Sequence, residues 1–260
     1  FHDIYKRLPP GYNGLVTDAR DAPDYWQWTA APNFWSVPWL GVNAYLLPFM
    51  EQTQLHDNIY VAFNPDKFAF DPQFPNAPRP DLAWWSEGTT WNTGRAKIPT
   101  FLCPSSDYKT ATVGQWCLFH QFGAQNGGSG SIGGGYFGGS AADMLGGSNY
   151  VGSAGGLGTI PTNAWDRWRG VYGNRTKYGF RDIKDGTAET LMFGEHLGGV
   201  DWWRSTVDSN WNRDHQFANS WIGSGCMATA WGLKSTPSAT AWNYQDWYMF
   251  SSEHPQKVLF

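Results

Sequence analysis

Four acidic side chains lie close together around a glycine in the stretch "GFRDIKDGTAETLMFGEH", residues 179–196. Such clusters are typical of loops that bind calcium and of some catalytic loops. If the loop is aligned as an EF-hand on Gly186, ligand positions one and three fall on Arg181 and Ile183, and neither side chain binds calcium. The pattern favours a structural turn at Asp185-Gly186, followed by a short capped element.

A second group of oxygen-bearing side chains lies between residues 201 and 214, in a region without helical periodicity. Asp208, Asn210 and Asp214 offer the ligands that calcium prefers, so calcium is the one cofactor for which the sequence provides candidates. Paired carboxylates between Asp201 and Asp214 would suit a hydrolase if a cleft held them about 5 to 10 Å apart. Spacing alone decides neither hypothesis.

Indole rings beside polar side chains are typical of sugar-binding loops, because sugars have apolar faces and polar rims. The segments "AWWSEGTTW" and "DWWRSTVDSNW" have this composition. They make four residues candidates for glycan binding: Trp84, Trp85, Trp202 and Trp203. Packing within a core or at a subunit interface also enriches tryptophan, and we favour packing over glycan binding.

The sequence contains no recognisable catalytic signature. Neither GxSxG nor HExxH occurs, and the six histidines stand apart from one another. "GSGSIG", residues 128–133, has the letters of a dinucleotide-binding loop, but the glycines that follow it will not form the helix that such a loop requires. We therefore expect no enzymatic activity.

The overall composition excludes several classes of protein. Aromatic residues make up 17% of the chain and charged residues 15%, which argues against disorder. A net charge of −4 argues against binding to nucleic acid. No apolar run approaches the roughly 18 residues of a membrane span. Because the chain starts at Phe1 without a methionine, we expect it to be a piece of a longer protein.

Two helices and one strand are expected in the first part of the chain. An amphipathic start that stops at Pro9-Pro10 predicts the end of a helix at residues 1–7, whose beginning lies upstream. Apolar spacing predicts a helix over residues 48–58, with a proline in its first turn. The apolar run "KIPTFLCP", residues 97–104, predicts a strand.

The remainder of the chain is expected to be rich in strands. The glycine-rich residues 123–147 form either a mobile loop or a closely packed backbone. Short β-like runs follow in "SNYVGSAG", "GVYG" and "LMFGEH", and residues 200–250 suggest strands with long loops. The expected fold class is α+β and mainly β, with a single head domain over residues 8–260.

Three cysteines occur, and no pair has the spacing of a zinc site. Cys103 and Cys117 are close enough in sequence to close a short disulfide loop. Three reduced, buried thiols, with Cys226 as the third, are the alternative, and the cysteines alone do not decide between the two.

Several segments, in this order, resemble the DUF1559 family of planctomycete-type proteins that begin with a type IV prepilin-like segment. They are "FHDIYKRLPPG", "LLPFMEQTQLHDNI", "IPTFLCPSS", "SNYVGSAGG", "GVYG", "FRDIKDGTAETLMFGE" and "FSSEHPQKVLF". The string "F.DI.DGT..TLM.GE" is quite specific to the family, and the resemblance extends over the whole chain.

The resemblance implies an upstream prepilin signal and a long hydrophobic helix, of which Phe1, His2 and Asp3 would be the end. Members also commonly carry an Asp-Gly nine residues after a histidine that His254 matches, and this falls beyond Phe260. The family has no established catalytic residues, and an association of its name with solute-binding proteins has little weight. The glycine-rich insertion at 123–147 and the tryptophan-rich segment at 200–247 depart from the family pattern.

The implied architecture is pilin-like, with the end of an N-terminal helix followed by an antiparallel-β head that carries long loops. The implied function is a non-enzymatic structural subunit of an extracellular or cell-surface assembly, secreted by a prepilin-type pathway. Its partners would be copies of itself in a homo-oligomer or filament, and further envelope proteins or glycans. Contact with a membrane would occur only through the upstream helix. Export would also favour a disulfide between Cys103 and Cys117.

Overall fold

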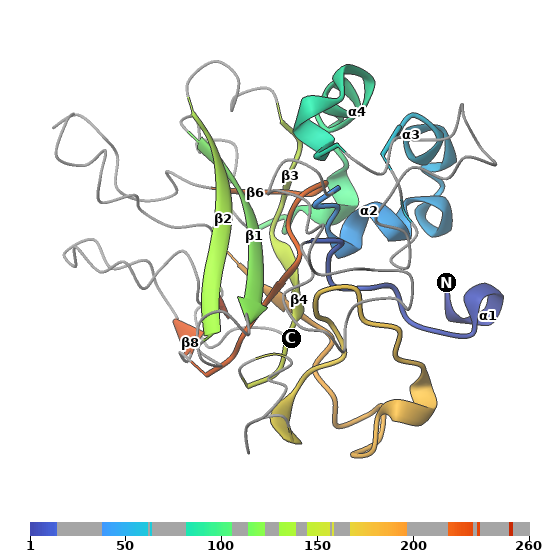
Figure 1. The fold of residues 1–260 in the computed structure, drawn as a ribbon, viewed down its shortest axis with the longest axis vertical. Helices are drawn as coiled ribbons and strands as arrows, with labels where there is room; N and C mark the ends of the chain where they lie inside the picture. The colour runs from blue at the N-terminus through green and yellow to red at the C-terminus, as the bar shows by residue number, and fades with distance from the viewer. Residues whose placement is uncertain are drawn as a thin grey trace, which may run out of the picture.

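Short helices and small sheets alternate along the chain in the computed structural model (Figure 1). The structure describes residues 1–14, 38–61, 63, 82–105, 114–122, 130–138, 145–156, 158, 167–196, 218–230, 233–234 and 250–251. For residues 114–122, 130–138, 218, 233–234 and 251 it describes the backbone alone.

The helices of this part of the chain are between three and six residues long. The α-helices are α1 (His2–Tyr5), α2 (Val42–Leu46), α3 (Thr53–Asp57) and α4 (Gly88–Thr93). The 3-10 helices are η3 (Leu47–Met50), η4 (Trp84–Ser86), η5 (Pro99–Phe101) and η10 (Phe180–Asp182).

The strands of this part form three small sheets. They are β1 (Gly114–Phe122), β2 (Gly130–Gly138), β3 (Gly147–Ser148), β4 (Tyr150–Ser153), β5 (Phe193–Glu195), β6 (Ala218–Ser220), β7 (Cys226–Met227), β8 (Leu233–Lys234) and β9 (Phe250–Ser251). Their orders are β2-β1-β6-β3, β5-β4-β7 and β8-β9. The pairs β1–β6, β4–β7 and β8–β9 are parallel, whereas the other pairs are antiparallel.

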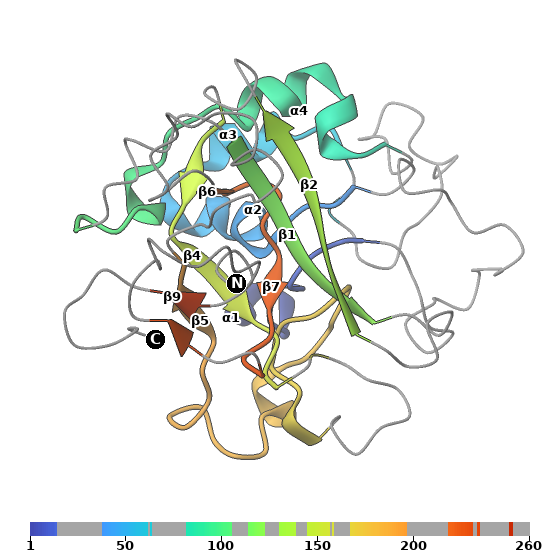
Figure 2. The same ribbon diagram turned by 90° about the vertical axis from the view of Figure 1, so that its left-hand side faces the viewer.

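The long antiparallel pair and the helices occupy opposite sides of the molecule. In Figure 1, β1 and β2 lie on the left, α2, α3 and α4 lie on the right, and β3, β4 and β6 pass between them. The view turned by 90° shows β1 and β2 in front of the α2 region (Figure 2). The short central strands thus lie between the long antiparallel pair and the helices.

A buried segment, residues 8–14, runs through the middle of this arrangement without forming a regular strand. On one side, Asn13 N–H donates to Leu40 C=O at 2.9 Å, and Asn13 C=O accepts from Trp39 N–H at 2.9 Å. On the other side, Gly11 N–H donates to Gly173 C=O at 2.9 Å, and Arg175 N–H donates to Tyr12 C=O at 2.8 Å. These bonds satisfy backbone groups that water cannot reach.

Large aromatic rings fill the core around this segment. Tyr12 stacks against Trp39, with ring centroids 6.1 Å apart, and both rings are fully buried. Trp84 stacks against Trp91 at 5.7 Å, while Trp221 packs against Phe101 at 6.3 Å. Burying rings of this size supplies much of the apolar area that a chain with such short elements needs.

Polar side chains attach the helices to the sheets at defined points. Asn43 in α2 donates from Nδ2 to Ser148 Oγ at 3.1 Å and to Tyr150 C=O at 3.2 Å. Trp221 donates its indole N–H to Ala96 C=O at 2.8 Å, at the end of the α4 region. The bonds of Asn43 fix α2 against β3 and β4, and the bond of Trp221 fixes the turn after β6 against the loop after α4.

Helix α4 begins at a side-chain cap. Glu87 accepts from the backbone N–H groups of Thr89 at 3.0 Å and Thr90 at 2.6 Å, and also from the Thr90 hydroxyl at 2.6 Å. Partial burial by itself would raise the pKa of Glu87, but these hydrogen bonds from Thr90 and Thr89 outweigh it and hold the pKa below its usual value.

Replacement of Glu87 by Ala is therefore expected to lower the free energy of unfolding by about 1 kcal/mol at neutral pH, as the loss of an N-cap does. Because the folded-state pKa lies below the ordinary value of 4.5, the contribution is complete above that value and is lost as the pH falls through the folded-state pKa. Urea denaturation of both proteins at pH 7 and pH 3 measures the difference. An equal loss at both pH values would contradict the role of the ionised cap.

Gly41 meets the loop after β6 so closely that no side chain fits there. A Cβ atom at this position would lie 2.0 Å from Ser224 O. Gly41 N–H also donates to Ile222 C=O at 2.8 Å, so the backbone cannot withdraw without breaking that bond. Replacement of Gly41 by Ala is expected to destabilise the fold by about 3 kcal/mol, as strong overpacking does.

Gly88 provides the control for this substitution, because a Cβ atom there would meet nothing within 4 Å. Replacement of Gly88 by Ala at the start of α4 is expected to stabilise the protein by up to about 1 kcal/mol. Thermal unfolding of the two variants compares them. Equal effects would show that close packing at Gly41 is not what requires glycine.

The structure confirms the expected mixture of helices and strands and corrects some of its details. Helix α1 lies within the predicted residues 1–7, and β4 and β5 form at the predicted runs. The predicted helix over 48–58 is broken, because Glu51 adopts a left-handed conformation with φ of 60° between η3 and α3. Pro48 lies in the first turn of η3, as predicted.

Two further predictions about the fold need correction. The strand expected at 97–104 is wrong, because a proline at the start favours the 3-10 turn η5 over an extended chain. "GVYG" forms no named strand, although the chain on either side of it makes isolated bridges. The described sheets are small and include parallel pairs, and short helices contribute beside them. The finer expectation of a mainly antiparallel-β head stays a prediction.

The glycine-rich stretch 123–147 contains β2, which pairs with β1 in an unbroken antiparallel register from Gly130 to Gly138. The described part of the stretch therefore uses glycine for closely paired backbone. Within residues 200–247, the described portion forms β6, β7 and β8. The predicted pilin-like architecture and the single head over 8–260 stay predictions.

Candidate functional site

Only some of the site residues that the sequence predicted lie in the described part of the chain. Trp202, Trp203, Asp208, Asn210 and Asp214 lie outside the described residues, as does Asp201. The calcium and hydrolase hypotheses for that region therefore stay predictions.

Trp84 and Trp85 are described, and their environments differ. Trp84 is fully buried, stacked on Trp91 and met edge-on by Trp85 at 5.6 Å. A ring in this position cannot offer its face to a sugar without opening the core. Trp85 is half-buried. Packing, which the sequence also suggested, accounts for Trp84, whereas the glycan hypothesis for the set of four tryptophans stays a prediction.

Of the two cysteines in the predicted disulfide, the structure describes the side chain of Cys103 alone. Cys103 is buried at the end of η5, and its backbone N–H donates to Asn149 Oδ1 at 2.9 Å. Cys117 lies in β1, where the structure describes the backbone alone. The disulfide therefore stays a prediction. Cys226 is buried in the core cluster.

The acidic stretch 179–196 forms a turn, as predicted. Gly186 has a φ of +86°, a conformation that favours glycine, and its carbonyl accepts from the Thr190 hydroxyl at 2.9 Å. Asp182 Oδ2 accepts from Gly179 N–H at 2.7 Å and so holds η10. Among the described residues, no three His, Cys, Asp or Glu side chains gather closely enough to hold a metal ion.

Sequence reasoning missed a buried polar network between the sheets. Asn149 N–H donates to Phe101 C=O at 2.8 Å, and Asn149 C=O accepts from His196 N–H at 2.6 Å. The side-chain Nδ2 of Asn149 donates to His196 C=O at 3.4 Å. His196 Nδ1 lies 2.6 Å from Asn219 Nδ2. With the Asn219 amide N–H donating, Nδ1 is the acceptor of this bond.

This network joins elements and leaves no room for a substrate. Asn149, His196 and Asn219 are each 1% exposed. Nearby, burial raises the pKa of the Tyr150 hydroxyl, and the Cys103 thiol and the Glu195 carboxyl add to the effect. A group of this kind, closed to solvent and bound to backbone, stabilises the junction of β4, β5 and β6.

Removal of the amide from this network should cost stability. Replacement of Asn219 by Ala leaves His196 Nδ1 without its 2.6 Å partner, and an expected loss of about 1 to 3 kcal/mol follows from an unsatisfied buried group. Replacement of the exposed Asn92 in α4 by Ala is the control and should change stability by less than about 0.5 kcal/mol. Chemical denaturation measures both, and similar values for the two variants would contradict the structural role of the network.

Apolar side chains gather on and around α1, and we name Phe1, Ile4, Tyr5, Phe49 and Phe180 the α1 surface. Phe1 is half-buried and packs against the core, whereas the other four side chains are exposed. Ile4 is 67% exposed and Tyr5 is 55% exposed, and no residue of α1 is buried. Phe1 contacts both Tyr5 at 4.5 Å and Phe49 at 5.5 Å between ring centroids. The rings thus support one another while remaining accessible to solvent.

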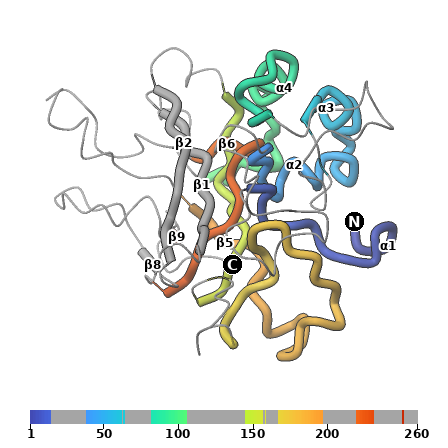
Figure 3. Tube along the Cα trace, viewed as in Figure 1, coloured from blue at the N-terminus to red at the C-terminus, as the bar shows by residue number. Residues whose placement is uncertain are grey.

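The same helix is attached to the loop that contains η10. His2 stacks on Phe180 at 4.0 Å, and Leu8 N–H donates to Tyr178 C=O at 2.6 Å. The Cα trace shows α1 and residues 167–196 next to each other at one side of the molecule (Figure 3). An exposed apolar patch held in place in this way is typical of a surface that binds another protein.

A family model described as "Protein of unknown function (DUF1559)", with the short name SBP_bac_10, matches residues 1–260. The chain belongs to the DUF1559 family. The sequence resemblance is thereby confirmed over the whole chain. A search of the curated proteins and a search of the solved structures found no significant match.

Membership in DUF1559 assigns no catalytic or binding residue, because the family description states no function. Within the described residues, no helix is both long and apolar enough to cross a membrane. The α1 surface is therefore the candidate site that the geometry itself provides. Its signal in the sequence was the aromatic content of "FHDIY" and "LLPFM", but only the fold brings these segments together.

Proposed function

We propose that this DUF1559 chain is the head of a non-enzymatic structural subunit that self-associates in an extracellular or cell-surface assembly. The observation that carries the proposal is the α1 surface, where exposed apolar side chains gather beside the start of the described chain. Aromatic residues are enriched in the buried centres of protein interfaces, and they lose little conformational entropy on binding.

Three other features support a structural role. Of the described tryptophans, Trp39, Trp84 and Trp221 are fully buried and pack inside the core, whereas Trp168 is 45% exposed. The buried polar network around His196 joins strands and is closed to solvent. The prepilin-like character of the sequences that this chain resembles supports secretion and display of the head. A filament, a lattice and an envelope-associated complex would all use lateral contacts between such heads.

Self-association should depend on the α1 surface. Replacement of Ile4 by Lys together with Tyr5 by Ser is expected to weaken self-association of the chain at least about tenfold, because it places a charge in an apolar contact. Thermal stability should stay close to that of the original protein, since both side chains are largely exposed. Sedimentation velocity over a range of protein concentrations measures the association.

Replacement of Tyr60 by Ser is the matched control, because Tyr60 is 47% exposed and is not part of the α1 surface. This variant should associate as the original protein does. Electron microscopy of the protein isolated from its native cells provides the second test. Dispersed heads there, together with a chain that sediments as a monomer at every concentration, would overturn the proposal.

A further inference from the structure

Charge is distributed unevenly along the chain. Residues 167–184 contain six Lys or Arg side chains and one Asp, whereas the other residues contain 12 Lys or Arg and 21 Asp or Glu. The acidic residues Asp185 and Glu189 follow at once. The loop that carries η10 thus changes from basic to acidic at the peptide bond between Lys184 and Asp185.

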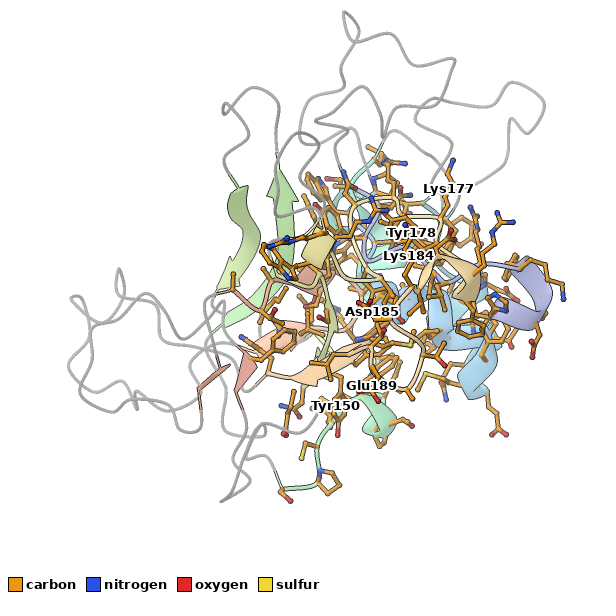
Figure 4. The ribbon with its side chains drawn as sticks, turned by 90° about the horizontal axis from the view of Figure 1, so that it is seen from below. Tyr150, Lys177, Tyr178, Lys184, Asp185 and Glu189 are labelled. Carbon is orange, nitrogen blue, oxygen red and sulfur yellow. The ribbon has the colours of Figure 1, made fainter. Side chains whose placement is uncertain are left out.

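The fold displays this change of sign on one face. Lys177, Lys184, Asp185 and Glu189 are all exposed. Seen from below, these side chains follow one another in that order across the molecule, with Tyr178 between the two lysines (Figure 4). We name these four charged residues the charged strip. Its basic half and its acidic half meet at the turn that Gly186 completes.

The strip is held in a fixed conformation by contacts on both sides. Ile183 and Met192 pack against the hydrophobic core. Gly186 C=O accepts from the Thr190 hydroxyl at 2.9 Å and from Glu189 N–H at 3.3 Å. A surface whose backbone is already ordered loses less entropy when it binds a partner.

Two exposed apolar side chains accompany the strip. Phe180 is 44% exposed and Leu191 is 46% exposed. Arg181 lies beside Phe180 in the sequence and is also exposed. Arginine and aromatic side chains are the residue types that contribute most at protein interfaces. The strip therefore combines complementary charge with apolar area.

We propose that the charged strip binds the charged strip of a second copy through a two-fold contact. Rotation by 180° about an axis near the peptide bond between Lys184 and Asp185 places the basic half of one copy on the acidic half of the other. Lys184 then pairs with Asp185 of the second copy, and Lys177 pairs with Glu189 of the second copy. A two-fold interface requires this kind of self-complementary surface.

The second copy is favoured over an acidic polymer because the strip presents both signs of charge. A polyanion would bind the basic half, and Asp185 and Glu189 would repel it. A second copy, by contrast, places opposite charge against both halves of the strip at once. The inference rests on the proposed self-association and names one of the surfaces that it uses.

Charge reversal of each half tests the pairing. Variant one combines Lys177→Glu with Lys184→Glu, and variant two combines Asp185→Lys with Glu189→Lys. Each variant alone places like charges opposite one another, so its self-association is expected to be at least about tenfold weaker than that of the original chain. An equimolar mixture should recover association, because opposite charges then face each other again. Sedimentation velocity of the chain at low ionic strength measures all three samples.

The matched control combines Arg95→Glu with Lys97→Glu, which changes the net charge as variant one does at two exposed positions outside the strip. It should associate as the original chain does. Circular dichroism establishes that each variant is folded.

The outcomes separate this contact from the proposed function. The two-fold strip contact is supported if the equimolar mixture regains self-association while each variant alone does not. Association retained in both single variants would overturn the contact and leave the structural role standing. If variant two binds a sulfated polysaccharide better than the original chain while self-association is unchanged, the basic half serves a polyanion and the contact is overturned. A monomeric original chain would overturn both.

Discussion

The pairing of the buried segment 8–14 on both of its sides is the interaction on which the rest of the structure depends. A polar backbone in the centre of a protein is costly unless each of its groups has a partner. Here the partners come from residues 38–41 on one side and 171–175 on the other. Three distant parts of the chain must therefore assemble together, and the aromatic core around Tyr12 and Trp39 closes over them.

The exposed features depend on this arrangement. Helix α1 precedes the buried segment directly, so its position is fixed where the segment enters the core. Residues 171–175 continue into the loop that carries η10, and the bond from Leu8 N–H to Tyr178 C=O ties that loop to the same segment. The α1 surface and the charged strip are thus neighbours because both extend from the ends of one buried contact. This proximity allows one assembly to use both surfaces.

Local sequence patterns predicted several of the local features, although the strand expected at 97–104 is a 3-10 turn and the helix expected over 48–58 is broken. The helix at α1, the proline in the first turn of η3, the strands β4 and β5, and the turn at Asp185-Gly186 all follow from a few neighbouring residues. Their determinants are short-range, namely apolar spacing, the fixed φ of proline and the tolerance of glycine for positive φ. The family resemblance, spread along the chain, was likewise visible in the sequence.

Features that depend on distant contacts were not predictable in this way. The parallel pairing of β6 with β1 joins Gln115 to Ala218, and the parallel pairing of β7 with β4 joins Gly152 to Cys226. No local sequence pattern indicates pairings between residues so far apart in the chain. The burial of Trp84 depends on Trp91 and on the segment around Trp39, while the same letters in a loop would suit a sugar site. The polar network combines Asn149 between β3 and β4, His196 after β5 and Asn219 in β6, and only the fold brings these residues together.

The buried segment also has a mechanical consequence. Because α1 leads straight into residues 8–14, a force applied at the N-terminal side reaches the core without passing through a flexible linker. If the force is directed along the segment, the hydrogen bonds of Gly11, Asn13 and Arg175 are loaded in shear and must fail together rather than one after another. In the surface assembly that we propose, a head built in this way would resist being pulled from its N-terminal side.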